Sequence, residues 1–346
     1  MREKPALPQG LITSCLRDHY GIDAVSARFL PIGYDLKAFV FECLTSTGDS
    51  YFVKVREGVV DPAGLLVPRV LTDHGVPNIL APLKTGSQTL SCTLDSYSVV
   101  VYPFVRGENA MIAGLDDDQW REFGATLRVV HDGGFPKMLK GVVPTESFSL
   151  PSADAVRCLT STVYNSRFDS PSATQWKSAW AEHRGVIEHI QARAEELAGQ
   201  LQRVQFDCVL CHADIHAANI MVERNGGIVL VDWDGPLIAP RERDLLFIIG
   251  SRISRRVEPR EEALFFEGYG KVEVNPDALT YFRYERILED IEATGRAVFH
   301  DGALSEQAKC EEARLFAGLF QSGDIVEAII TGDRHWTGPP TRYEDR

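Results

Sequence analysis

Carboxylates, imidazoles and a carboxamide are concentrated in one stretch of the chain, HADIHAANIMVERNGGIVLVDWDGP, residues 212–236. Two strand-like runs in it, NIMVE and IVLVDW, flank Asn225-Gly226, the strongest short-range hairpin signal in the sequence. If these two residues form the turn, Asn219 and Asp232 each stand six residues from it and lie directly opposite each other. This placement of Asn219 opposite Asp232 predicts that the two side chains hold one cation. A β-bulge in either strand would shift the register.

Asp214 lies five residues before Asn219, in a segment too polar and too interrupted for a core strand. We expect it in a loop at the same end of the hairpin. A loop carboxylate upstream of an amide ligand, with a second carboxylate across a hairpin, is the arrangement used for phosphoryl transfer. In this interpretation Asp214 accepts a proton from the attacking hydroxyl, while Asn219 and Asp232 hold Mg²⁺ against the nucleotide phosphates. Amide and carboxylate oxygens suit that hard cation.

The same chemistry needs a lysine on an early strand to hold the α- and β-phosphates. Lys54 in YFVKVR fits this role, and its side chain faces away from Val53 and Val55 because strand residues alternate. A lysine in the middle of a surface strand is common, so the assignment depends on the hairpin.

Zinc binding is an alternative for the same stretch, because Cys208, Cys211, His212, Asp214 and His216 are all possible ligands. Zinc sites normally need a second ligand pair at a suitable spacing, and no other CxxC or HxxxH occurs. FDCVLC alternates like a strand, which favours packing roles for its cysteines. We expect His212 to hydrogen-bond backbone groups and to orient the catalytic loop.

The elements that must position these groups follow from composition and periodicity. Residues 36–44, 51–56 and 97–102 are rich in β-branched and aromatic residues and predict strands, with one short helix at about 61–74. From Pro103 onward the periodicity is helical. We expect three helices there. The first starts at a capping box formed by Asp116 and Gln119 and has an apolar face at Trp120, Phe123, Leu127 and Val130. The second spans about 173–203, and the third spans 281–299 with an apolar stripe at Tyr284, Ile287, Leu288 and Ile291.

This division, in a chain of 346 residues, predicts an α+β fold with two lobes. A small β-rich lobe, residues 1–102, would bind the nucleotide. A larger helical lobe, residues 103–346, would carry the catalytic and substrate-binding groups.

The composition favours a soluble cytoplasmic protein that acts on a small molecule. Seven scattered cysteines argue against a disulfide framework, and the N-terminus MREKPALPQG has no apolar region typical of a signal peptide. No apolar run approaches the ~18 residues of a membrane span. The formal net charge of −13 disfavours nucleic acid and anionic membranes and suits a cationic substrate. No protein partner is implied.

Glu285, Glu289 and Glu292 share one face of the helix expected at 281–299. Two interpretations stay open. The residues form a solvated surface, or they form an anionic wall that holds an ammonium-bearing substrate beside Asp214, which is itself a candidate to contact that substrate.

The stretch HADIHAANIMVERNGGIVLVDWD resembles the H-x-D-x-x-x-x-N motif, followed by a metal-binding aspartate, of aminoglycoside phosphotransferases and the related choline and homoserine kinases. These enzymes are relatives of the protein kinases. Within the family the chain looks most like the spectinomycin phosphotransferases. The segments HYGID, YFVKVR, VVVYPF, FFEGYG and FRYERILEDI carry that likeness along nearly the whole chain.

The resemblance implies a protein-kinase-like fold with Asp214 as catalytic base, Asn219 and Asp232 as magnesium ligands, and Lys54 on the phosphates of ATP. It also implies that backbone groups near residues 102–104, which are Tyr102, Pro103 and Phe104, meet the adenine. The chain departs from the family in one respect. The helix after Lys54, DPAGLLVPRVLTDHG, contains no glutamate to pair with it. Asp61 or Glu57 is a possible substitute, or Lys54 engages phosphate alone.

The first functional hypothesis is an ATP- and Mg²⁺-dependent phosphotransferase that modifies a hydroxyl of a cationic aminocyclitol or aminoglycoside antibiotic, most of all spectinomycin, and so confers resistance. The alternative is a metabolite kinase of the choline, homoserine or sugar type. A third hypothesis, an inactive nucleotide-binding regulator, is supported only by the missing helix glutamate.

Overall fold

The computed structural model describes residues 7–33, 37–165, 169–302, 304–321, 323 and 325–333. The chain divides into two compact units. The first unit contains Met1–Pro144, Val209–Ile238 and Ala263–Gly270, and the second contains Thr145–Cys208, Ala239–Glu262 and Lys271–Arg346. The lobe boundary expected after residue 102 stays a prediction.

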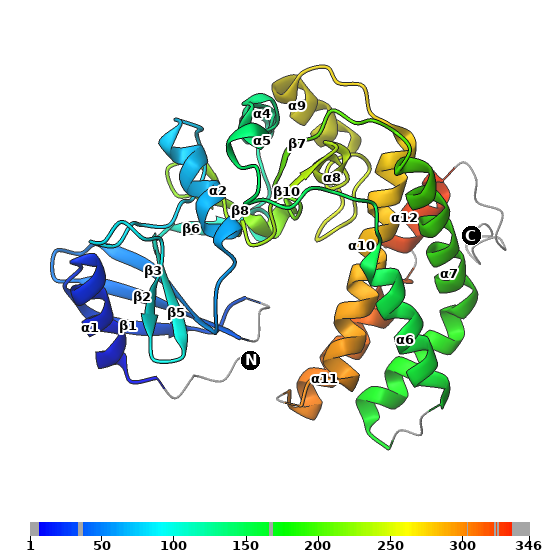
Figure 1. The fold of residues 1–346 in the computed structure, drawn as a ribbon, viewed down its shortest axis with the longest axis horizontal. Helices are drawn as coiled ribbons and strands as arrows, with labels where there is room; N and C mark the ends of the chain where they lie inside the picture. The colour runs from blue at the N-terminus through cyan, green and yellow to red at the C-terminus, as the bar shows by residue number, and fades with distance from the viewer. Residues whose placement is uncertain are drawn as a thin grey trace. The chain divides into compact units, whose positions relative to one another are not determined.

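The first unit begins with helix α1 (Gln9–Tyr20), which packs against strand β1 of an antiparallel five-stranded sheet (Figure 1). The strand order is β1-β2-β3-β5-β4. The strands are β1 (Ala24–Leu30), β2 (Ala38–Thr45), β3 (Ser50–Glu57), β4 (Cys92–Leu94) and β5 (Tyr97–Pro103). The three strands predicted from composition are therefore confirmed as β2, β3 and β5.

The two faces of this sheet have different surroundings. Val53 and Val55 of β3 are fully buried in an apolar cluster that also contains Ile12 and Leu16 of α1. Lys54 lies between them in the strand and faces the other side, as the alternation predicts. Phe52 and its cross-strand neighbour Tyr102 share the face of Lys54, with ring centroids 6.2 Å apart. The sheet therefore presents one lysine and two aromatic rings on the side away from α1.

Helix α2 (Pro62–Asp73) confirms the short helix expected after β3. It begins where the Asp61 carboxylate accepts a hydrogen bond from the Ala63 N–H and where proline occupies the first turn. Its Gly64 permits a close approach, because a Cβ at that position would lie 3.0 Å from the Trp233 carbonyl oxygen and 3.1 Å from Asp234 Cα. The segment around residues 233–234 therefore packs directly on the helix backbone.

The rest of the first unit surrounds the polar stretch. Its elements are β6 (Gly107–Asn109), α3 (Ala110–Ala113), α4 (Asp117–Asp132), α5 (Phe135–Met138), β7 (Val209–Cys211), the 3₁₀ turn η1 (Ala217–Asn219), β8 (Ile220–Glu223), β9 (Ile228–Leu230), β10 (Leu237–Ala239) and the C-terminal part of α9 (Pro259–Tyr269). The capping box of α4 is confirmed, with Asp116 and Gln119 bonded reciprocally. Gln119 also donates to the Gly226 carbonyl at 3.0 Å and so anchors the hairpin turn to α4.

The hairpin exists, but its predicted register is wrong by one residue. Met221 pairs with Val229, and the Glu223 N–H donates to the Gly227 carbonyl, so the turn contains three residues, 224–226, instead of two. Gly226 has φ +92°, the left-handed conformation of a three-residue turn with a bulge. The Val231 N–H consequently donates to the Asn219 carbonyl, which places Val231, and not Asp232, beside Asn219.

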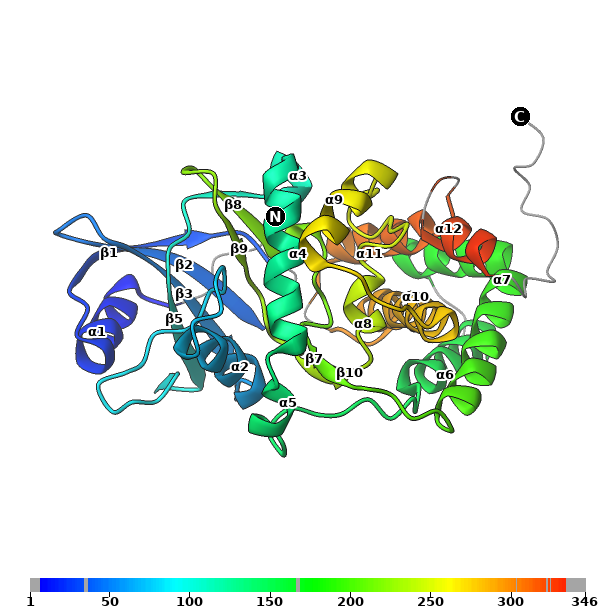
Figure 2. The same cartoon turned by 90° about the horizontal axis from the view of Figure 1, so that it is seen from above.

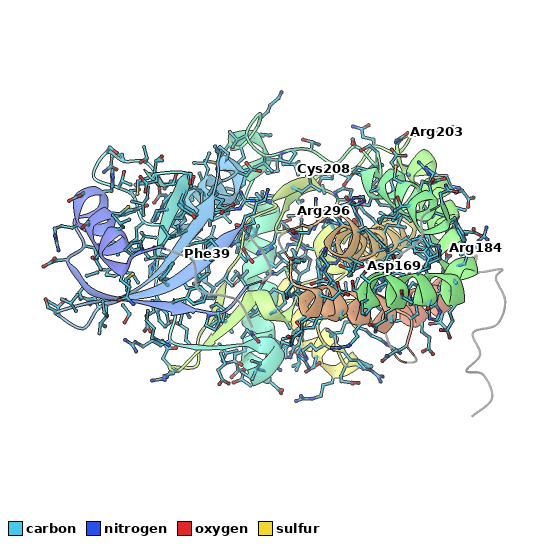
Figure 3. All side chains as sticks on the ribbon, turned by 90° about the horizontal axis from the view of Figure 1, so that it is seen from below. Phe39, Asp169, Arg184, Arg203, Cys208 and Arg296 are labelled. Carbon is cyan, nitrogen blue, oxygen red and sulfur yellow. The ribbon has the colours of Figure 1, made fainter. Side chains whose placement is uncertain are left out.

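The second unit is built on helices, of which α7 lies beside α10 and α11, and α10 also contacts α6 (Figure 2). In Figure 3 the labels Arg184 and Arg296 mark α7 and α10. The helices are α6 (Pro151–Asn165), α7 (Pro171–Leu201), α8 (Glu242–Leu245), α10 (Pro276–Phe299), α11 (Glu306–Gly318) and α12 (Ile325–Gly332). The stripe predicted for α10, formed by Tyr284, Ile287, Leu288 and Ile291, is fully buried. The long helices expected at 173–203 and 281–299 are confirmed.

Among the helices of the described residues, none combines the length and apolar character that a membrane crossing requires.

Candidate active site

His212 connects the two loops that carry the predicted catalytic and metal-binding residues. It follows β7 and is fully buried. Its Nε2 lies 2.9 Å from the Val231 carbonyl oxygen, and its Nδ1 accepts from the Asp214 N–H at 3.3 Å. The ring therefore donates through Nε2 and accepts through Nδ1, which is the neutral tautomer. His212 orients backbone groups, as the sequence predicted.

The Asp214 side chain points into a group of polar side chains and stays 43% exposed. Its Oδ2 lies 3.4 Å from His216 Nε2 and 3.4 Å from Asn219 Nδ2. Asn219 Nδ2 also donates to the Asp214 backbone carbonyl at 2.8 Å. Because the amide nitrogen makes these bonds, the amide oxygen is the atom of Asn219 that can serve a cation.

Backbone strain accompanies these side chains. Ala213 has φ +69° and Asp232 has φ +63°, conformations that cost a residue with a Cβ about 1–2 kcal/mol. One strained residue precedes the predicted base, and the other is the predicted metal ligand. Asp232 adopts this conformation directly after Val231, the residue whose N–H donates to the Asn219 carbonyl.

Lys54 has acidic partners that the sequence interpretation did not assign. Its Nζ lies 2.6 Å from Asp234 Oδ2 and 3.6 Å from Asp232 Oδ1. Asp61, one of the substitutes considered, caps α2 instead. Asp234 follows Asp232 by two residues in VDWDG, but this local spacing does not indicate a pairing with Lys54.

The electrostatics of this group are unusual for surface carboxylates. Desolvation of the half-exposed Asp232 side chain raises the pKa of its carboxyl, while the charge of Lys54 opposes the rise. Burial also raises the pKa of the Tyr102 phenol, with the charges of Asp234 and Asp232 adding to the effect. The site is therefore acidic, with Lys54 as a nearby positive charge.

The donor set fits Mg²⁺. Asn219 and Asp232 offer an amide oxygen and a carboxylate, and Asp234 adds a second carboxylate next to Asp232. Magnesium prefers such oxygen ligands together with the oxygens of bound phosphates. The metal-binding roles remain predictions for this chain.

The predicted adenine contact lies at the end of β5. Pro103 has no N–H, and the Phe104 N–H donates to the Ser50 carbonyl at 3.2 Å. Tyr102 stands beside Phe52 on the face that carries Lys54. The contribution of residues 102–104 to nucleotide binding stays a prediction.

The three glutamates of α10 differ in their surroundings. Glu285 is buried, accepts from the Tyr281 hydroxyl at 3.1 Å and pairs with Arg243 at 3.0 Å. Glu289 pairs with the same arginine at 3.3 Å, whereas Glu292 is partly exposed. Burial raises the pKa of the Glu285 carboxyl to about 7. Glu285 therefore has a structural partner, and the substrate-binding role of the three residues stays a prediction.

The fold and this arrangement are those of a kinase-like phosphotransferase. The model of the phosphotransferase enzyme family named APH matches residues 63–282, which is more than half of the chain. The protein belongs to this family.

Individual relatives are consistent with that membership. The crystal structure of spectinomycin phosphotransferase APH(9)-Ia with ADP and spectinomycin is 30% identical, covers 95% of this chain and 99% of that chain, and superposes with a TM-score of 0.86. Its AMP-bound complex has a TM-score of 0.82 at 30% identity, covering 93% of this chain and 98% of that one. Protein StrN of Streptomyces griseus is 25% identical over 247 residues, 68% of this chain and 73% of StrN.

Proposed function

We propose that the protein transfers the γ-phosphate of ATP to a hydroxyl of a cationic aminocyclitol antibiotic, most of all spectinomycin. The observation that carries this proposal is the joining of Asp214 and Asn219 by hydrogen bonds in one loop, with His212 connecting that loop to the segment that holds Asp232. A catalytic base and two magnesium ligands are the parts that phosphoryl transfer requires.

Each residue then has a defined task. Asp214 accepts the proton of the acceptor hydroxyl as that oxygen attacks the γ-phosphorus. Lys54 neutralises phosphate charge, and Asp234 holds its ammonium group in position. Asn219 and Asp232 would hold Mg²⁺, which neutralises charge on the phosphates when it is bound.

Support for the acceptor comes from similarity and from charge. The relative crystallised with spectinomycin matches nearly the whole chain at 30% identity. The net charge of −13 favours a cationic acceptor over an anionic one. Glu292, and Glu289 beside it, are candidates to contact the ammonium groups, and their loss should raise KM for the acceptor without changing KM for ATP.

The test is ADP release with Mg·ATP in the presence of spectinomycin, other aminocyclitols, aminoglycosides, choline or homoserine, with mass spectrometry of each product. A spectinomycin product heavier by one phosphate supports the proposal. Turnover confined to choline or homoserine would reject the antibiotic as the acceptor and keep the phosphotransfer chemistry. Nucleotide binding without turnover on any acceptor would favour a regulator.

A further inference from the structure

Two cysteines and a histidine converge in the first unit, on the sheet face opposite to Lys54. Cys15 and His19 belong to α1, and Cys92 begins β4. The Cys15 and Cys92 sulfurs are 3.3 Å apart and share a hydrogen bond. The two sulfurs and a ring nitrogen of His19 all lie within 4.8 Å of one another. Three side chains of the types that bind thiophilic metals therefore surround one point.

The positions of these residues follow from their elements. Cys15 and His19 are four residues apart and so occupy the same face of α1. The Tyr20 hydroxyl donates to the Val99 carbonyl at 3.1 Å, and Val99 is the cross-strand neighbour of Cys92. The Gly86 N–H donates to the His19 carbonyl at 2.8 Å, which fixes the loop leading to β4. The helix end and the strand are held together independently of the thiols.

We propose that Cys15, His19 and Cys92 form a binding site for one Zn²⁺ ion. Two thiolates and one imidazole are ligands that zinc prefers, and two thiolates neutralise its charge. Tetrahedral zinc with Zn–S bonds of about 2.3 Å places its sulfurs about 3.8 Å apart, so the sulfurs must separate by about half an ångström. Zn²⁺ displaces one proton from each thiol, so binding gives a zinc dithiolate with no net charge and releases two H⁺.

The exposure of the three ligand residues indicates what the fourth zinc ligand would be. Cys15 is buried, Cys92 is partly buried and His19 is exposed. The metal would enter from the side of His19, and water would complete the coordination. Because Lys54 and its carboxylates occupy the other face of the sheet, the proposed zinc site is separate from the predicted magnesium site.

The test uses the full-length protein, freed of metal with a chelator and kept in a phosphine reductant, with Co²⁺ as a spectroscopic probe. We expect one equivalent of Co²⁺ to produce a thiolate-to-cobalt charge-transfer absorption that Zn²⁺ abolishes by displacement. His19→Gln changes an exposed side chain and should weaken binding by more than about tenfold. Cys92→Ala should remove the absorption, while Cys158→Ala, a change at an exposed cysteine on α6, should leave it intact.

Three results would overturn the proposal. They are absence of the charge-transfer absorption in the parent protein, its persistence at full strength in both His19→Gln and Cys92→Ala, and isolation of a Cys15–Cys92 disulfide in the presence of reductant. Because His19 is exposed, its variant separates metal binding from folding. Phosphotransfer by the same His19→Gln protein should be unchanged, so failure of the proposed reaction and failure of the zinc site are distinguishable.

Discussion

Lys54 and Asp234 form an ion pair at 2.6 Å, although 180 positions separate them along the chain. The pair joins β3 to the segment that follows the hairpin, and Asp232 lies at 3.6 Å from the same ammonium group. In this chain the strand lysine thus takes its acidic partner from the segment after the hairpin, since α2 contains no glutamate.

The pair predicts a specific effect of Asp234→Asn. Losing a charge-assisted hydrogen bond costs about 1.5 kcal/mol at a half-exposed position, so kcat/KM for Mg·ATP should fall about tenfold. Asp234→Glu should restore part of the activity. The matched control is Asp73→Asn, because Asp73 is similarly exposed and pairs with Arg69 and Lys84 at the end of α2. Equal kinetics for Asp234→Asn and Asp73→Asn would show that Asp234 does not position Lys54.

Asp214→Asn tests the catalytic base. Asparagine preserves the size of the side chain and its hydrogen-bonding geometry but cannot accept the proton. We expect kcat to fall about 10²- to 10⁴-fold, with Mg·ATP affinity unchanged in calorimetry. An enzyme that keeps full turnover would overturn the assigned role.

Replacing glycine by alanine should have opposite effects on stability at Gly226 in the hairpin turn and at Gly185 in α7. Gly226 has φ +92°, so Gly226→Ala should lower the free energy of unfolding by about 1 kcal/mol or more. Gly185 lies inside α7, where an added Cβ would meet nothing within 4 Å, and Gly185→Ala should raise the free energy of unfolding by up to about 1 kcal/mol. Thermal unfolding of both variants measures the difference. A stabilising Gly226→Ala would contradict the three-residue turn.

Glu285 predicts a pH dependence of stability. Burial raises its pKa from 4.5 to about 7 in the folded protein, so the neutral form stabilises the fold fully below about pH 4.5. That contribution is lost as pH rises to about 7. Relative to Glu285→Gln, the parent protein should therefore lose up to about 3 kcal/mol of stability across this interval. Urea unfolding of both proteins at pH 5 and pH 8 measures the change, and a difference independent of pH would rule out the raised pKa.

The elements were predictable where periodicity is strong. β3 and α10 follow directly from alternating and helical patterns, and α4 from its capping box. The hairpin register was not, because Asn225-Gly226 suits a two-residue turn as well as the last two positions of a three-residue turn. The decisive property is which residue adopts a left-handed conformation, and that depends on contacts such as the one between Gln119 and Gly226.

The residues of the candidate site were also predictable only in part. The types of Asp214, Asn219 and Asp232 indicated the chemistry before their positions were known. Asp234 could not be assigned from the sequence, because its partner Lys54 is remote along the chain and because the family resemblance implies a partner on α2. Local spacing identifies residues of one loop, whereas ion pairs between distant segments require the folded chain.

The most direct test of the proposed function is the mass of spectinomycin after incubation with the purified protein and Mg·ATP, compared with the same reaction containing Asp214→Asn. We predict a product heavier by one phosphate, formed with one ADP per product and nearly absent with the variant. Unmodified spectinomycin after prolonged incubation with the parent protein, under conditions in which another acceptor is phosphorylated, would contradict the assignment of the substrate.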